Sequence, residues 1–341
     1  MIWMAWRLQR NLYLFFVAVS AALIAFTIFN GLHVQAVAHQ WMGNPCHGGN
    51  GFAAKYQSFC QGLNNEYIHS ITTGQFLHWM ALLPMELLGL VLGANLVASE
   101  IDRNTVRTAW TQSITRNRWF VSKVTVGLAS LVLLAGPLCV TASWWIGASR
   151  YTSRLSTNGF TYAGWMPLAI GIFAFAVATI IGTVMRRPGW SVAAALVVMT
   201  VVMWAMQADV RTAIVPLRST TLQMAPLTKG DVTVGVPTSQ APQSAWVVFN
   251  GFVPVNWSGG LPTWGQEAPW LHEVNRCPMY FVTNPNAYAT CLRKLDLRNV
   301  EMYVADNEYW TLQLREGGLY LGGAALFLGG SLLLVRRSRP Y

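Results

Sequence analysis

The sequence predicts an all-α polytopic membrane protein with six transmembrane helices, a short cytoplasmic coupling helix and a mostly irregular external insertion before the last helix. Three observations support this fold class. Only 11% of the 341 residues are charged, against roughly a quarter in soluble domains. Hydrophobic residues make up 53%, and the mean hydropathy is +0.36. Six stretches also have the roughly 20 apolar residues that a membrane-crossing helix needs. This composition excludes a disordered, collagen-like or coiled-coil chain and argues against an ordinary soluble protein.

The predicted spans define the organisation of the chain. The first is too long for the apolar region of a signal peptide, and no small-x-small cleavage site follows it, so we expect it to be retained. Spans one to five fall within 1–207, an extracellular insertion covers 208–316, and 317–341 holds span six and a tail. The six spans are 13–33, 76–98, 124–146, 162–184, 189–207 and 317–335.

The distribution of Lys and Arg predicts the orientation. One set of connecting segments contains 12 cations in about 47 residues, and the other contains 11 in about 166 residues. The cation-rich side is expected to be cytoplasmic. We therefore predict a multi-pass protein of the cell membrane with both termini in the cytoplasm. The net charge of +10 follows from this topology, so no nucleic-acid partner is expected. The cation-rich segments are 1–12, 99–123, 185–188 and 336–341.

Four cysteines fall in the predicted external segments, where an oxidising environment favours disulfides. Cys46 and Cys60 lie in the first external loop, 34–75, and Cys277 and Cys291 lie in the large insertion. Three connectivities are open. We favour Cys46–Cys60 and Cys277–Cys291, because each closes a local loop of 14 steps. Cys139, within span three, is expected to be a small buried hydrophobe.

No catalytic, cofactor or metal site is predicted in this chain. Five of the six histidines lie in or beside the first external loop, but their spacing matches no standard zinc pattern. No Gly-x-x-x-x-Gly-Lys-Ser/Thr run occurs, so the chain lacks a Walker ATP site. The lysines are Lys55, Lys123, Lys229 and Lys294.

The loop between spans two and three, 99–123, has an arrangement of apolar and charged residues that a simple connecting loop does not require. Thr105 can cap a short helix in which Val106, Ala109 and Trp110 form one apolar face. Several cations follow at the membrane boundary, with Trp119 as an interface anchor. The pattern allows two interpretations. The segment is either a lever that transmits force from a cytoplasmic partner, or an ordinary positive-inside loop with snorkelling arginines.

This run resembles the corresponding loop of ABC-2 type transporter permeases, especially the actinobacterial group. The matching residues are Glu100, Thr105, Ala109 to Ser113, Arg116, Arg118, Trp119 and Lys123. A second patch, Tyr309-Trp310-x-x-Gln313-x-x-Glu316-x-Gly318, is similar to the approach to the last span in those permeases.

The resemblance implies a half-transporter without its own ATP site. Two permease subunits, like or unlike, would form the pathway in membrane lipid. Separate ATPase subunits would bind ATP and Mg and dock on residues 100–119, so ATPase activity is expected only in the complex. Trp310, Gln313 and Glu316 would form the outer lip of span six. The residues implied in coupling are Glu100, Arg103, Thr105, Ala109, Trp110, Gln112, Arg116, Arg118 and Trp119.

Polar and small residues inside the predicted spans are further candidates. Glu86 is the only acid within a predicted span, and His78 lies about two turns away in the same span. Such a carboxyl either lines a substrate pathway with His78 or is neutral and hydrogen-bonded to a neighbouring helix. Gly89-x-x-x-Gly93 and Gly318-x-x-x-Gly322 permit close helix approach, and we favour packing within one subunit over a dimer seam.

The large insertion shows little periodicity. Val232, Val234 and Val236 alternate with smaller residues and predict one short strand. Residues 299–316 are predicted to be a helix that runs into the last span.

The leading functional hypothesis is a permease subunit of an ABC exporter that moves an amphipathic drug, lipid or peptide outward. One alternative is a non-transporting membrane sensor or assembly factor with a ligand-binding external domain. The other is a membrane-embedded enzyme, which would need a second acid or a nucleophile at the depth of Glu86.

Overall fold

The chain forms two compact units in a computed structural model. One unit comprises Met1–Ala208 and Gln313–Tyr341 and is called the helical unit below; the other is Asp209–Leu312, the 209–312 unit. The described residues are 2–43, 57–102, 115–149, 154–155, 157–221, 223–229, 232–238, 241–242, 245–258, 260–262, 264–274, 276–277 and 285–337.

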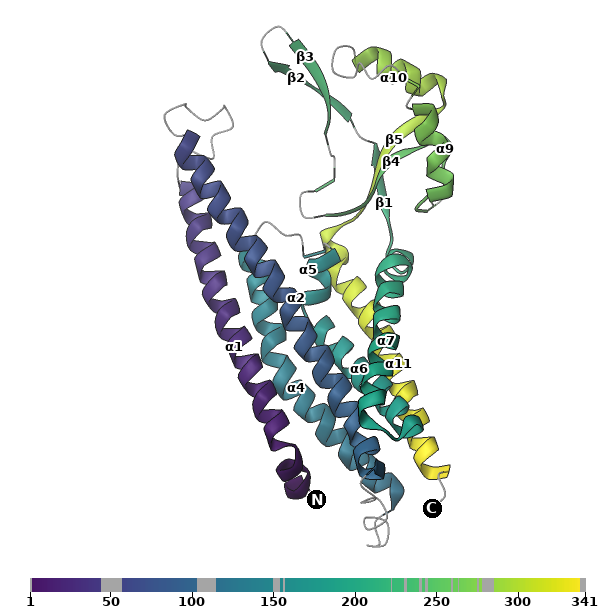
Figure 1. The fold of residues 1–341 in the computed structure, drawn as a ribbon. Helices are drawn as coiled ribbons and strands as arrows, with labels where there is room; N and C mark the ends of the chain where they lie inside the picture. The colour runs from purple at the N-terminus through teal and green to yellow at the C-terminus, as the bar shows by residue number, and fades with distance from the viewer. Residues whose placement is uncertain are drawn as a thin grey trace. The chain divides into compact units, whose positions relative to one another are not determined.

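The helical unit is built from long apolar helices (Figure 1). Five segments of the described chain are long and apolar enough to cross a membrane: Leu14–Gln40, Arg116–Gly147, Met166–Met185, Pro188–Ala213 and Asp306–Arg337. An all-α polytopic membrane fold is thereby confirmed. The helices are α1 (Ile2–Gly43), α2 (Gln57–Asp102), α4 (Arg116–Ser149), α5 (Thr157–Tyr162), α6 (Met166–Met185), α7 (Pro188–Ala205) and α11 (Tyr309–Arg337).

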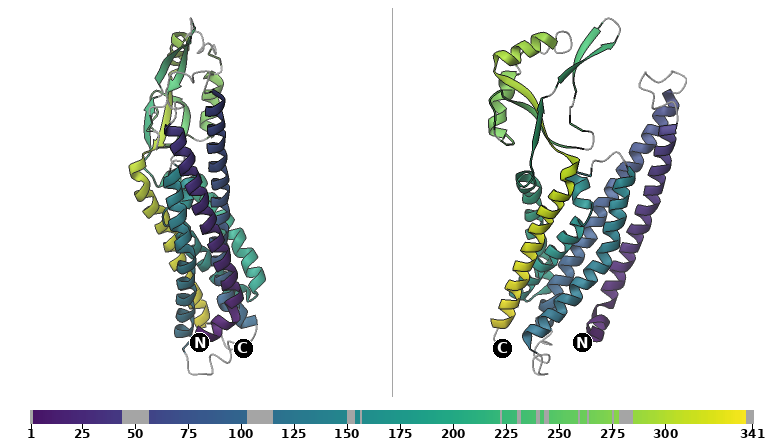
Figure 2. Two further views of the ribbon diagram at one scale, coloured as in Figure 1. Left: turned by 90° about the vertical axis from the view of Figure 1, so that its left-hand side faces the viewer. Right: turned by 180° about the vertical axis from the view of Figure 1, so that it is seen from behind.

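The predicted second span, 76–98, falls inside α2. Helix α2 is continuous over Gln57–Asp102, and its described apolar part is the shorter stretch Met85–Ser99. A total of six membrane-crossing helices therefore stays a prediction. The beginning of α1 and the end of α11 lie at the same end of the helical unit (Figures 1 and 2).

Helices α2 and α6 pack backbone to backbone through glycines. A Cβ atom on Gly89 would collide with the carbonyl oxygen of Gly171, and one on Gly93 would lie 3.0 Å from the carbonyl carbon of Phe175. In return, a Cβ on Gly182 of α6 would lie 3.0 Å from the carbonyl oxygen of Ala94. The first Gly-x-x-x-Gly pair thus packs within the chain, as predicted.

No described part of the chain packs against the second Gly-x-x-x-Gly pair, contrary to the prediction. Gly318 and Gly322 lie in α11, and no described atom outside their own helical environment comes within 4 Å of a Cβ built on either. Both glycines lie on the exposed side of the helix, because the buried side is occupied by larger residues such as Leu312 and Tyr320.

The 209–312 unit contains regular structure, so the prediction of a mostly irregular insertion is wrong. Three antiparallel strands form a sheet in the order β1-β5-β4, and β2 and β3 form a separate antiparallel pair. The prediction of a strand around Val232–Val236 is confirmed by β3. The elements are β1 (Arg218–Thr221), β2 (Gln223–Lys229), β3 (Val232–Thr238), β4 (Trp246–Pro254), α9 (Trp264–Val274), α10 (Pro285–Lys294) and β5 (Leu297–Val304).

The predicted helix over 299–316 is also wrong in its first half. Residues 299–304 belong to the central strand β5, a 3₁₀ turn follows at Asp306–Glu308, and α11 begins at Tyr309. Val300, Met302 and Val304 alternate along β5 and are buried, which is the period of a strand. Both partners of β5 lie more than 40 residues earlier in the chain, so local sequence does not reveal the pairing.

The Cys277–Cys291 disulfide is confirmed, with 5.9 Å between the Cα atoms. Cys277 is buried in a small cluster with Val274, Leu292 and Leu297. Cys60 is also disulfide-bonded, and its predicted partner, Cys46, lies outside the described residues. Cys139 is a buried free thiol in α4, as predicted.

Candidate functional site

The predicted coupling segment lies between the end of α2 at Asp102 and the start of α4 at Arg116. Glu100 belongs to the last turn of α2, and nothing is described of its side chain. The coupling helix itself lies outside the described residues, and its role stays a prediction. The predicted coupling residues outside the described chain are Arg103, Thr105, Ala109, Trp110 and Gln112.

Near the start of α4, Trp119 and Phe120 are buried where several helices meet. Trp119 is only 2% exposed and packs in a cluster drawn from α1, α2, α4, α6 and α11. Its neighbours in this cluster include Leu96 of α2, Phe175 of α6 and Val335 of α11. The ammonium nitrogen of Lys123 lies 5.0 Å from the centre of the Trp119 ring. Trp119 was predicted to be an interface anchor, and its ring instead packs inside the helical unit.

Two further contacts tie the start of α4 to the end of α11. Arg336 Nε donates to Asn117 Oδ1 at 2.6 Å, and Arg116 Nη1 donates to the backbone oxygen of Arg336 at 3.2 Å. Thr115 caps α4, since its hydroxyl accepts from the Arg118 backbone N–H at 3.4 Å. The Arg118 side chain is exposed. The chain leaving the coupling segment is therefore anchored to the last long helix.

The intramembrane candidates are only partly described. Glu86 is partly buried in α2, next to the buried Met85, which packs against Leu138 and Cys139 of α4. Nothing is described of the His78 side chain, so a joint role of His78 and Glu86 stays a prediction.

The Tyr309–Gly318 patch at the start of α11 contributes both buried and exposed side chains. Gln313 is fully buried and its Nε2 donates to the Ala163 carbonyl at 2.9 Å. Gly164 has a positive φ of 66°, and a Cβ there would lie 3.0 Å from Gln313 Cδ, so only glycine fits this turn. Glu316 is 1% exposed, whereas Trp310 is 58% exposed. Of the predicted outer lip, only Trp310 presents its side chain outward.

Acidic residues occur within the bounds of two apolar segments: Asp209 in Pro188–Ala213, and Asp306, Glu308 and Glu316 in Asp306–Arg337. The sequence prediction began the last span at 317, whereas the apolar helix extends over Asp306–Arg337. Where the membrane-crossing part of this helix begins stays a prediction, and so does Glu86 as the only acid within a span.

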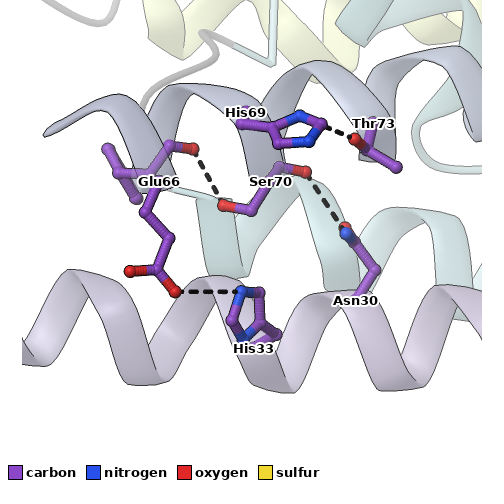
Figure 3. Close-up of polar contacts among 7 residues, drawn as sticks. Asn30, His33, Glu66, His69, Ser70 and Thr73 are labelled. Carbon is purple, nitrogen blue, oxygen red and sulfur yellow. Dashed lines mark hydrogen bonds and ion pairs between the residues drawn. The ribbon is translucent and has the colours of Figure 1, made fainter. Parts of the chain in front are cut away.

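A polar contact between α1, α2 and α4 was not predicted. Trp145 Nε1 donates to Asn30 Oδ1 at 2.7 Å, and Asn30 Nδ2 donates to the Ser70 carbonyl at 3.2 Å. Figure 3 shows Asn30 of α1 pointing toward Ser70 of α2. Gly74 leaves room for this contact, because a Cβ there would lie 2.6 Å from Asn30 Oδ1. A lone Asn in the first apolar stretch was the available sequence signal.

Asn30→Leu should lower the free energy of unfolding by about 1–2 kcal/mol, because the buried Trp145 N–H loses its acceptor. Thermal unfolding in nanodiscs would measure the change. Ser70→Ala is the matched control, since Ser70 contributes only its backbone carbonyl to Asn30 and its hydroxyl donates within α2 to Tyr67. Equal midpoints for the two variants would contradict a stabilising role of the contact.

Two of the histidines in or beside the first predicted external loop take part in pairwise contacts. His33 Nε2 lies 3.6 Å from Glu66 Oε1, and the His69 ring lies 3.4 Å from the Thr73 hydroxyl (Figure 3). Within the described residues, no three His, Cys, Asp or Glu side chains gather in a way that could hold a metal ion.

These features define a class of protein: a multi-pass membrane protein whose long helices pack closely on either side of the α2–α4 segment. A sequence profile of the ABC-2 membrane transporter related family matches residues 16–211, more than half of the chain. The chain belongs to this family. It is a membrane permease component of an ABC transporter, a class that works with ABC ATPase subunits and generally lacks an ATP site of its own. Comparisons with curated proteins and with solved structures gave no match.

Proposed function

We propose that this chain is the permease subunit of an ABC exporter that moves an amphipathic drug, lipid or peptide outward. Separate ATPase subunits bind ATP and Mg and dock on residues 100–119, which face the cytoplasm. A second permease subunit, like or unlike, completes the pathway. Glu86 and His78 contribute to that pathway from α2.

The packing of the long helices on either side of the coupling segment carries this proposal. On one side, α2 packs backbone to backbone on α6 through Gly89 and Gly93. On the other, α4 begins with the buried Trp119 and with Asn117 bonded to Arg336 of α11. Side chains in such a close-packed cluster cannot move without moving their neighbours. A displacement of the coupling segment therefore shifts several long helices at once.

Exposed apolar surface supports the membrane setting and a second subunit. Trp204 is 70% exposed in α7, and Leu326 is 78% exposed in α11. Side chains of this kind need lipid or protein around them. The open Gly318 and Gly322 on α11 allow close approach of another helix.

Trp110→Asp should abolish docking of the ATPase subunit. The substitution places a charge on the predicted apolar face of the coupling helix, where a partner would have to bury it. Co-expression with the ATPase subunit, co-purification, and ATPase assay in nanodiscs would measure the effect. We expect loss of the complex and a drop of at least tenfold in permease-dependent ATP turnover, whereas membrane insertion stays intact.

Trp310→Asp is the matched control, because Trp310 is exposed and is predicted to lie on the opposite side of the membrane. A stable complex with normal ATP turnover in the Trp110→Asp variant would contradict the docking proposal. Equal losses in both variants would show that the effect is not specific to residues 100–119.

A membrane sensor is the second candidate function, and a cavity in the 209–312 unit favours it. A sensor would bind its ligand without stimulating ATP turnover by a partner chain. The ATPase assay on the unsubstituted protein separates the two functions, since only a transporter subunit should raise the turnover.

A further inference from the structure

The 209–312 unit contains a cavity of about 540 Å³. Pockets of about 300–1,000 Å³ are the usual size for small organic ligands. Its apolar floor is one face of the sheet, formed by Val253 of β4 and by Val300 and Met302 of β5. The segment 212–217 and the turn around Trp257 complete the wall.

The guanidinium group of Arg298 lies beside this apolar floor. Arg298 precedes Val300 by two residues in β5, so both side chains lie on the same face of the sheet. Arg298 Nη2 donates to the Trp257 carbonyl at 3.1 Å. Its Nε is buried and has no hydrogen-bond partner within the described chain. The guanidinium group carries a positive charge and Arg298 lines the cavity, so an anionic ligand group is favoured there.

The charge around the cavity is positive. Arg218 also lines it, and the nearest carboxylate to that guanidinium, Glu308, lies 4.0 Å away and is not a lining residue. None of the residues that line the cavity is acidic. Serine hydroxyls from Ser219 and Ser258 add further donors.

We propose that this cavity binds an amphiphile with a single apolar chain and an anionic head group. The head group accepts from Arg298, and the chain lies against Val253, Val300 and Met302. The last residues of the apolar helix Pro188–Ala213, Thr212 and Ala213, line the same cavity. An amphiphile is therefore the ligand type that matches both the apolar floor and the end of an apolar helix. Neither nucleotide nor a partner chain is needed for this binding, so it goes beyond the proposed transport function.

Photo-crosslinking of the full-length protein in phosphatidylcholine nanodiscs would test the proposal. The probe is a twelve-carbon fatty acid that carries a diazirine in its chain, and labelled peptides are identified by mass spectrometry. We expect labelling of peptides that contain residues 212–219, 253–261 and 298–302. The alcohol of the same chain length and a trimethylammonium analogue should label these peptides about tenfold less, because the alcohol is neutral and the analogue is positively charged, so neither forms a charge-assisted hydrogen bond with Arg298.

Arg298→Gln should reduce labelling by the fatty acid about tenfold, and Arg298→Lys should retain most of it because the charge remains. Arg293→Gln, an exposed cation of α10 away from the lining residues, is the control and should label normally. An intact Cys277–Cys291 disulfide in each variant, checked by thiol labelling, shows that the unit is folded. Equal labelling of Arg298→Gln and the unsubstituted protein, or equal labelling by the alcohol or the cationic analogue, would overturn the proposal.

Discussion

Gly93→Leu should disrupt the packing of α2 against α6 and lower the free energy of unfolding by about 3 kcal/mol or more. The first carbon of the new side chain would lie 3.0 Å from the carbonyl carbon of Phe175 and 3.1 Å from the Ala178 Cβ, and the rest of it has no space to occupy. The obstacle is the backbone of a neighbouring helix, which cannot turn away as a side chain can. The thermal midpoint measured by fluorescence-detected size-exclusion chromatography would report the loss.

Gly62→Leu is the matched control in the same helix. No described atom lies within 4 Å of a Cβ built on Gly62, which is exposed. Leucine has the higher helix propensity, so this variant should be neutral or slightly more stable. A similar midpoint for Gly93→Leu and Gly62→Leu would show that α2 and α6 do not pack as described. Loss of ATPase stimulation by Gly93→Leu in the complex would follow from the same contact, because α2 leads into the coupling segment.

Joint replacement of Cys277 and Cys291 by serine should lower the stability of the 209–312 unit by about 3 kcal/mol. The disulfide closes a loop of 14 steps, and the chain-entropy model gives about this value for such a loop. It also holds α9 and α10 beside β5 through the cluster around Val274 and Leu297. Hydrogen exchange followed by mass spectrometry should show faster exchange in β4 and β5 and no change in α6.

Cys139→Ala is the control for loss of a cysteine, because Cys139 is a free thiol in α4. It should leave exchange in β4 and β5 unchanged. Unaltered protection of both strands in the double serine variant would mean that the sheet and its buried residues hold the unit without the crosslink.

The sequence predicted features that depend on composition and on short-range spacing. The long helices were predictable, because a stretch of about 20 apolar residues has few stable alternatives to a helix in a bilayer. The Cys277–Cys291 pairing was predictable, because proximity in the chain favours closure of a local loop. The Gly89–Gly93 contact followed from spacing that places two small residues on one helix face.

The candidate sites were predicted less well, because they depend on which residues meet in space. Trp119 at a helix end is typical of an interface anchor, yet it packs against residues of α2, α6 and α11 from distant parts of the chain. Gln313 and Glu316 were predicted to form an outer lip, and their burial by other parts of the chain is not visible in a hydropathy window. Arg298 carried no motif, and its position beside an apolar cavity depends on strand pairing with β4.

By itself, the sequence determined the class of protein: a low proportion of charge and long apolar stretches require a membrane, and the resemblance in the α2–α4 segment and at the start of α11 indicated the permease family. Only the tertiary structure decided which side of each helix is buried, that the 209–312 segment forms a sheet, and that Arg298 lines a cavity. The physical reason is that a residue's tendency to enter a membrane is local and additive along the chain, whereas strand pairing and side-chain burial depend on contacts between residues far apart in sequence.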